Sequence, residues 1–393
     1  MSLWVDKYRP KKLTDLSHNA HLTSLLQSLS QQPRDLPHLL LYGPNGSGKK
    51  TRCMSLLESI FGEGVYKMKI DVRQFVTPSN RKLDLNVVSS AYHLEITPSD
   101  MGTNDRIVIQ HLLKEVAQME QVDFKDSRDG LAHRYKCVII NEADSLTRDA
   151  QAALRRTMEK YSRNIRLIMI CDSVSSIISP IKSRCFMVRC PAPNEAEMVE
   201  ILKHVTWEEK VNVDSDQIFE KIARESGGNL RKGLLMLEAM ALSNEMHLKK
   251  ETPVVRPDWE SVIMKLANKI QKEKSVGCLV ECRSVLYDLL AHCIPARTIL
   301  QELTFALLQS SKTDKTKVAI IEKFKKKNRL AVLWNVDRFY MIFWHIAFLQ
   351  ELSYKSLLLR FCKTSSVFDE RLSLGNKPIY HLEGFVARAM CSM

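Results

Sequence analysis

The sequence predicts an α/β fold in which a P-loop domain with a parallel sheet precedes two helical domains. Short apolar segments alternate with helix-like segments over the first half of the chain. A glycine-rich loop, residues 43–49, directly follows the first apolar segment. From residue 191 onward the pattern becomes mainly helical. Alternation of this kind is typical of a doubly wound sheet with helices on both faces.

Three apolar segments predict buried parallel strands: His38–Tyr42, Tyr135–Ile140 and Ile165–Cys171. Each is short and almost continuously hydrophobic, as expected where helices cover both faces of a sheet. A helix is expected over Lys50–Ile60, after the glycine loop. Another is expected over Ser145–Tyr161, where apolar residues recur at helical spacing.

Proline residues mark the expected domain boundaries. The first domain ends near Cys190, and Pro191–Asn194 forms a linker that caps a new helix. Pro253 and Pro257 mark a second boundary. The predicted domains are therefore 1–190, 191–254 and 255–393, and candidate helices in the last are Trp259–Ser275, Val276–His292 and Pro295–Ser310.

Composition indicates an ordinary soluble globular chain with a basic surface. Of 393 residues, 45% are hydrophobic and 26% are charged, and the net charge is +13. Such a charge favours polyanionic partners, most obviously nucleic acid, because phosphate contacts release counterions. A solvated basic surface is the alternative. Charge by itself does not separate the two.

The cysteines and the apolar segments exclude several classes of protein. Ten cysteines occur without framework spacing, and the close pair Cys278 and Cys282 has no matching Cys or His pair. The pattern argues against zinc, and no metal site is predicted; reduced thiols in a cytosolic or nuclear compartment fit better. The N-terminus lacks a signal-peptide pattern, and no apolar stretch reaches 18 residues, so no membrane association is expected.

The glycine loop has the GxxxxGK pattern of a P-loop in the required strand–loop–helix context. Its backbone N–H groups are expected to surround phosphate oxygens, with the adjacent lysine adding positive charge. A chance glycine-rich turn is the alternative. Lys50 occupies the position that normally offers a Ser or Thr hydroxyl to Mg²⁺, and Thr51 follows one residue late. The expected phosphate-loop residues are Gly43, Asn45, Gly46, Ser47, Gly48, Lys49, Lys50 and Thr51.

The second predicted strand ends in Asn141-Glu142-Ala143-Asp144, a pattern similar to a Walker B strand. Asn141 replaces the first carboxylate, which helps to hold Mg²⁺, with a neutral amide. Glu142 keeps the position that orients the attacking water, although a helix cap is the alternative for this dipeptide. Lys50 and Asn141 thus both replace residues that would normally help to hold Mg²⁺. We therefore expect nucleotide binding with Mg²⁺ weak or absent, and poor hydrolysis.

Five motifs in order identify a family resemblance: Trp4–Pro10, the P-loop, Asn141–Asp144, Gln151–Glu159 and Lys182–Cys185. The chain resembles, over almost its whole length, a small subunit of replication factor C, the eukaryotic clamp loader of the AAA+ family. It is most similar to the fungal fifth-subunit group, called the third in vertebrates, which shares the Gly-Lys-Lys and Asn-Glu departures. The resemblance implies an AAA+ P-loop domain with a parallel sheet, a small helical lid domain and an all-α collar domain.

The resemblance also implies roles for particular residues. Arg184 resembles an arginine finger that acts in trans on a neighbour's ATP, whereas Glu142 belongs to a degenerate catalytic site in this chain. Arg231 resembles the lid-domain arginine that contacts phosphate in cis. Asp172 falls where related subunits often carry Asn, and a carboxylate there would repel the γ-phosphate. The adenine pocket is implied to include Val5, Tyr8, Arg9 and Pro10, which alternatively anchor the N-terminus on the core.

The implied assembly is a spiral of this chain and four other replication factor C-type subunits in the nucleus. It uses ATP to load the ring-shaped sliding clamp (PCNA) onto primer–template DNA, and this chain retains ATP or ADP. The chain is thus an ATP-binding subunit of a DNA-dependent ATPase complex. A competent stand-alone AAA+ motor is the rival class. Candidate contacts to DNA phosphates, each equally compatible with a solvated loop, are Arg81, Lys82, Ser99 and Arg106.

Residues 323–364 depart from the family pattern as an anomalous insertion. The stretch is rich in Lys and aromatic residues and lacks Gly and Pro. One interpretation is an amphipathic helix for a partner or a membrane surface. Another, slightly favoured, is a translated intron without function. The third is a lineage-specific helical hairpin that buries Leu333, Phe339, Phe343 and Leu349.

Overall fold

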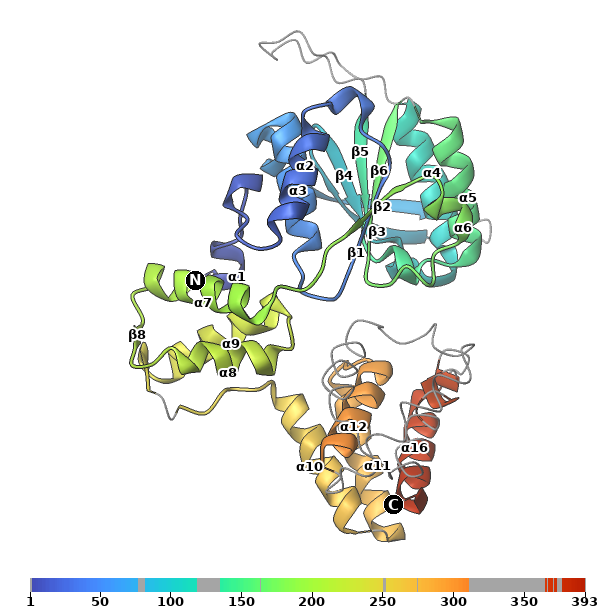
Figure 1. Cartoon of the computed structure of the whole chain (residues 1–393). Helices are drawn as coiled ribbons and strands as arrows, with labels where there is room; N and C mark the ends of the chain where they lie inside the picture. The colour runs from blue at the N-terminus through green and yellow to red at the C-terminus, as the bar shows by residue number, and fades with distance from the viewer. Residues whose placement is uncertain are drawn as a thin grey trace, which may run out of the picture. The chain divides into compact units, whose positions relative to one another are not determined.

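The computed structural model divides the chain into two compact units, residues 1–254 and 255–393. Each unit has its own hydrophobic core and is described separately (Figure 1). The residues described are 2–76, 82–118, 135–162, 164–249, 252–273, 275–310, 365, 367–369, 371–372 and 377–392. Arg81 and the stretch 323–364 therefore lie outside the described residues, and the interpretations of that stretch stay hypotheses.

The first unit is organised around a seven-stranded sheet with the order β2-β3-β4-β5-β6-β1-β7. Strands β4, β5, β6, β1 and β7 pair in parallel, whereas β3 pairs antiparallel with both β2 and β4. The predicted parallel sheet is thus confirmed at its centre and extended by an antiparallel hairpin. The strands are β1 Leu39–Tyr42, β2 Lys69–Val76, β3 Lys82–Ser89, β4 His93–Ile96, β5 Lys136–Ile140, β6 Ile165–Cys171 and β7 Phe186–Arg189.

The three predicted strands are β5, β6 and β1, which lie next to one another in the sheet. Each of these strands is covered by helices on both faces, so its successive residues enter two different hydrophobic cores. This is why the strands appear in the sequence as continuous hydrophobic runs. Along β1, Leu40 enters one core while Leu39 and Leu41 enter the other. Strands β2, β3, β4 and β7 were not predicted. Strands β2 and β7 leave several apolar side chains exposed, and β4 buries the polar residues His93 and Glu95.

Helices cover the two faces of the sheet in separate layers. Figure 1 shows α2 and α3 on one face and α4 and α5 on the other, consistent with the two cores. The predicted helices after the P-loop and after Walker B are confirmed within three residues at each end. The helices of this part are α2 Ala20–Ser30, α3 Lys49–Phe61, α4 Asp105–Gln118, α5 Arg148–Lys160 and α6 Ser179–Lys182. Short 3₁₀ turns are η1 Leu13–Asp15, η2 Pro33–Asp35, η3 Glu63–Tyr66, η4 Pro98–Asn104 and η5 Ala143–Ser145.

A helical subdomain completes the first unit. It begins at Asn194, where a capping box with Glu197 satisfies the first free N–H groups of α7. Its hydrophobic core also includes Trp4 from the short N-terminal helix α1. The elements are α1 Trp4–Lys7, α7 Glu195–Glu208, α8 Gln217–Ser226 and α9 Leu230–Ser243, with a two-stranded pair of β8 Asn212–Val213 and β9 His247–Leu248.

The second unit is helical throughout its described part. Helices α10, α11 and α12 match the three predicted helices to within about one turn. Their apolar faces bury Leu286 and Phe385, which are fully inaccessible to solvent. Among the described residues, no helix is long and apolar enough to cross a membrane. The helices are α10 Asp258–Lys272, α11 Val276–Ala291, α12 Ala296–Ser310 and α16 Pro378–Ser392.

The buried histidine of β4 predicts acid sensitivity of the first unit. Burial lowers the pKa of His93 from 6.5 to about 4. Below pH 6.5 the unfolded chain therefore takes up a proton that the folded chain does not. Stability is lost progressively between pH 6.5 and about 4, by roughly 3 kcal/mol at most, at 1.36 kcal/mol per pKa unit. Urea unfolding between pH 7 and 5 measures this loss, and His93→Gln should reduce its slope. The exposed His204, changed to Gln, provides the control and should leave the slope unchanged.

Candidate nucleotide-binding site

The glycine loop lies between the end of β1 and the first turn of α3. Gly46 and Gly48 have φ angles of 74° and 81°, a left-handed conformation that favours glycine. The Ser47 hydroxyl is buried without a hydrogen-bond partner in the described part of the chain. A helix N-terminus with inward-facing N–H groups is a ready anion site. The loop residues therefore fit a nucleotide phosphate.

Lys49 lies inside this loop and is almost fully buried. Its ammonium donates to the carbonyls of Gly43 and Pro44 at 2.8 and 2.9 Å. It also forms an ion pair of 2.7 Å with Asp172, which follows β6. The structure thus brings Lys49, the predicted phosphate-binding residue, together with Asp172, the carboxylate that follows the third predicted strand. Asp172 competes with phosphate for the same ammonium.

Asp172 also influences Asp144 of the second acidic motif. Burial raises the pKa of the Asp144 carboxyl, and the negative charge of Asp172 raises it further. The two carboxylates therefore face a common region at the ends of β5 and β6. This region is more negative than a γ-phosphate would favour.

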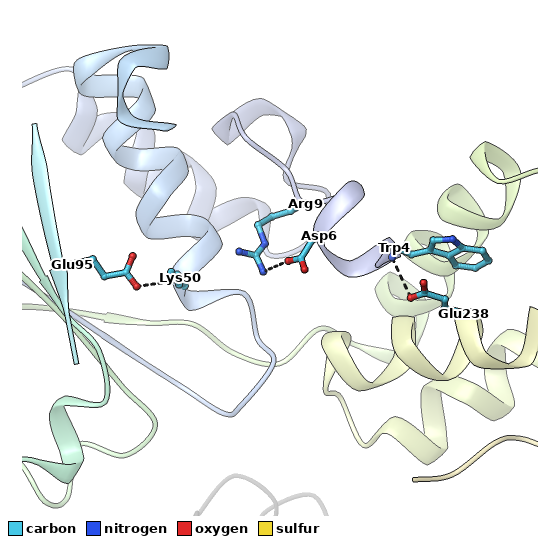
Figure 2. Close-up of polar contacts among 6 residues, drawn as sticks. All are labelled: Trp4, Asp6, Arg9, Lys50, Glu95 and Glu238. Atoms are coloured by element: carbon cyan, nitrogen blue, oxygen red, sulfur yellow. Dashed lines mark hydrogen bonds and ion pairs between the residues drawn. The ribbon is translucent and has the colours of Figure 1, made fainter. Parts of the chain in front are cut away.

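Lys50 points to a buried carboxylate on β4. Its ammonium forms an ion pair with Glu95 (Figure 2). The Asn141 side-chain amide donates to the same Glu95 oxygen at 2.7 Å. Mg²⁺ requires oxygen ligands in near-octahedral geometry. Here the nearby groups are an ammonium and an amide N–H, and both are directed at the only carboxylate of the cluster. This donor set does not fit a divalent cation.

Glu142 adopts a strained backbone at the end of β5. Its φ of 48° and ψ of 45° are left-handed, which is uncommon for a residue other than glycine. Its carboxylate accepts a 3.1 Å hydrogen bond from the Ser99 hydroxyl. The predicted water-orienting group is therefore held by a residue that the sequence suggested as a DNA contact.

The helical subdomain contacts the P-loop directly. The Leu230 N–H donates to the Gly46 carbonyl at 3.2 Å, and Asn229 caps α9 by accepting from Lys232. Arg231 is exposed in the first turn of α9. This contact brings the predicted lid arginine to the helix end nearest the phosphate loop.

The N-terminal segment packs on the same helical subdomain. Val5 and Tyr8 are half-buried against its core, and the Trp4 N–H donates to Glu238 at 3.2 Å. Arg9 pairs with Asp6 at 2.9 Å (Figure 2), and Pro10 is half-buried. The anchoring role considered for this segment is present in the structure. Its contact with adenine stays a prediction.

Sequence reasoning missed a buried group behind the loop. His18 is buried, and its Nε2 has no partner among the described residues. A Cβ added to Gly48 would lie 3.7 Å from that nitrogen. Burial lowers the pKa of His18, and the fully buried Arg52 lowers it further while donating to the His18 carbonyl at 2.8 Å. Nothing in the sequence marks His18, because it reaches the loop only through folding.

Arg184 pairs with residues outside this chain's own phosphate loop. It follows α6, and its guanidinium pairs with Glu159 of α5 at 2.6 Å and donates to the Pro180 carbonyl at 2.8 Å. About a third of its side chain is exposed. The structure does not place it among the residues that hold Lys49, and its action on another subunit stays a prediction.

The remaining DNA candidates are divided between two regions. Lys82 is exposed at the start of β3, in the antiparallel hairpin. Arg106 is exposed in the first turn of α4, close to the Ser99 segment. Asp105, beside it, is buried and accepts from Thr147. The contact of these residues with DNA stays a prediction.

Three family models match separate parts of the chain. A model for the C-terminal domain of replication factor C subunit 3 matches residues 259–333 and 340–393. A model described as RCF1/5-like, AAA+ ATPase lid domain matches 200–242. A DNA polymerase III, delta subunit model matches 18–194. Together they confirm the predicted fold class of a P-loop domain, a lid and a helical C-terminal domain.

Curated relatives extend over the whole chain. Replication factor C subunit 5 of Saccharomyces cerevisiae is 63% identical over 393 residues, 100% of both chains. Replication factor C subunit 5 of Neurospora crassa is 44% identical over 99% of this chain and 97% of its own. Replication factor C subunit 3 of Homo sapiens is 39% identical over 99% of this chain and 96% of its own.

Gly46→Ala should weaken the contact between the loop and the helical subdomain. A Cβ at this position would lie 1.8 Å from the Asn229 side-chain oxygen, which must then leave its capping position. Loss of an N-cap costs about 1 kcal/mol. The matched control is the same substitution in an Asn229→Ala background, which keeps the positive φ of residue 46 but removes the side-chain atoms that the added Cβ would meet. Chemical denaturation should show a larger loss from Gly46→Ala in the wild-type background than in the Asn229→Ala background; equal losses would contradict the contact.

Proposed function

The chain belongs to the replication factor C subunit family of AAA+ clamp loaders, and from that membership we propose that it binds ATP or ADP within a nuclear clamp-loader complex. In this proposal it joins four related subunits that use ATP to open the sliding clamp (PCNA). The complex then loads the clamp onto primer–template DNA. The basic net charge of +13 supports a polyanionic partner.

The phosphate loop is the part of the chain proposed to hold the nucleotide. The N–H groups of residues 43–49 and the N-terminus of α3 would bind phosphate oxygens. Lys49 would exchange its bond to Asp172 for one to phosphate, and Arg231 would approach from the first turn of α9. The half-buried Val5 and Tyr8 offer apolar surface suited to a base.

One observation carries the proposal of weak hydrolysis: Lys50 and Asn141 both bind Glu95. Phosphoryl transfer depends mainly on positioning and on neutralising the developing charge. The Lys50 ammonium has no lone pair for a cation, and Asn141 offers only a neutral amide oxygen where a carboxylate would also neutralise charge. Two further carboxylates support weak hydrolysis. Asp172 would repel a γ-phosphate, and Glu142, the expected water-orienting group, accepts a hydrogen bond from Ser99.

Arg184 is proposed to serve a neighbouring subunit. A guanidinium presented in trans stabilises charge on the transferring phosphoryl group. The partial exposure of Arg184 and its position after α6 support this role. If the Arg184 guanidinium left Glu159 to bind a neighbour's phosphate, it would have an anionic partner both with and without nucleotide.

The lone full-length chain should hydrolyse ATP no faster than background in single-turnover assays with magnesium. A stand-alone AAA+ motor, the rival function, would turn over at roughly 1 s⁻¹ or faster. Filter binding of labelled nucleotide in the same samples separates a chain that binds without turnover from one that does not bind. Brisk turnover by this chain would replace the present proposal with the motor.

Arg184→Ala should reduce ATP hydrolysis by the assembled complex while nucleotide stays bound to this chain. Removing a trans arginine costs on the order of 10³-fold at the site that it serves. The neighbouring half-buried Lys182, changed to Ala, is the matched control and should leave the rate unchanged. If complex ATPase were the same in the Arg184 and Lys182 variants, the trans role would be wrong.

A further inference from the structure

The carboxylate of Glu95 lies in an unusual position for a charge. Glu95 is the third residue of β4, and its side chain is only 8% exposed. β4 pairs in parallel with β5, so that Ile96 lies opposite Ile140. Asn141 continues β5, and its N–H donates to the Ile96 carbonyl at 2.9 Å. A buried charge in this setting is stable only when it is paired and hydrogen-bonded.

Two groups satisfy this carboxylate, and both are the departures seen in the sequence. The Lys50 ammonium approaches from the first turn of α3, while the Asn141 amide approaches from the end of β5. They converge on one oxygen, Oε1. The formal charges of the three side chains sum to zero, with one cation, one anion and one neutral amide.

We propose that Lys50, Glu95 and Asn141 form a closed cation position, in which the Lys50 ammonium is a tethered substitute for a divalent metal and Glu95 holds it in place. The inference rests on the proposed nucleotide site and assigns a role to Glu95, which no motif marks. Because the cation is part of the chain, nucleotide binding does not depend on added magnesium. The same tether keeps a metal out, since the only carboxylate of the cluster is already neutralised.

The charge balance of the three side chains determines which substitutions would allow a divalent cation to bind here. Lys50→Thr alone leaves one uncompensated negative charge, and Asn141→Asp alone leaves the ammonium facing two carboxylates. The double substitution creates a hydroxyl and two carboxylates with a net charge of −2, which matches a divalent cation. Without metal the two close carboxylates repel each other, so this variant should be destabilised until a cation binds.

The test compares full-length wild type, Lys50→Thr, the double variant Lys50→Thr/Asn141→Asp, and the double variant combined with Glu95→Gln. Each is melted with and without millimolar Mn²⁺ or Mg²⁺, in the absence of nucleotide. The double variant should melt below wild type in EDTA and gain about 5 °C or more with cation at a large excess over its Kd. Wild type should not respond, and Glu95→Gln should abolish the response. The surface ion pair of Lys203 with Asp216 supplies a control, Lys203→Thr, which should not respond either.

A second measurement uses wild type alone and so does not depend on how the variants fold. Its affinity for a fluorescent ADP analogue should agree within about twofold between EDTA and magnesium, a difference under 0.5 kcal/mol. A tenfold loss in EDTA, or a double variant that folds but ignores cations, would overturn the tethered-cation proposal. Failure of the proposed function is distinct, because it would appear as wild type that binds no nucleotide under either condition.

Discussion

The buried carboxylate of Glu95 constrains the whole phosphate-binding end of the sheet. It lies on β4 between the P-loop helix and the end of β5, where burial requires a cation within reach. Lys50 supplies that cation from α3, and Asn141 completes the hydrogen bonding from β5. These contacts join α3, β4 and the end of β5 next to the phosphate loop. The interaction neutralises the Glu95 carboxylate, which is the basis of the proposed closed cation position.

A second ion pair between a loop lysine and a carboxylate lies two strands away, at the end of β6. Lys49 is bound to Asp172 as well as to two loop carbonyls, so the phosphate-binding ammonium already has partners. Burial raises the pKa of the Asp144 carboxyl, and the nearby negative charge of Asp172 raises it further. Both lysines of the Gly-Lys-Lys sequence thus pair with carboxylates from the sheet. These pairs support the proposal that the site holds a nucleotide more readily than it cleaves one.

The contacts around the loop connect nucleotide binding to the rest of the first unit. Leu230 at the start of α9 bonds to Gly46, and Asn19 donates to Glu197 at the start of α7. Trp4 fixes the N-terminal segment to the same helices through Glu238 (Figure 2). Loop, lid and N-terminus therefore share one set of contacts. Gly46 and Asn229 approach so closely that a Cβ on Gly46 would meet the Asn229 side-chain oxygen at 1.8 Å.

The sequence by itself determined the central strands, the helices that follow them and the chemistry of the loop, because continuous apolar runs and glycine spacing are local signals. It also identified Lys50 and Asn141 as departures, since each occupies a fixed place in a motif. It did not predict the antiparallel hairpin β2–β3, although Leu83, Leu85 and Val87 alternate with polar residues along β3, nor the strand β4, which buries two polar side chains. Only the tertiary structure decided the partners: Glu95 for Lys50, Asp172 for Lys49, Ser99 for Glu142 and His18 beneath Gly48. These pairs join residues 43 or more positions apart in all but the last case, and parallel pairing brings strand ends together that no local pattern relates.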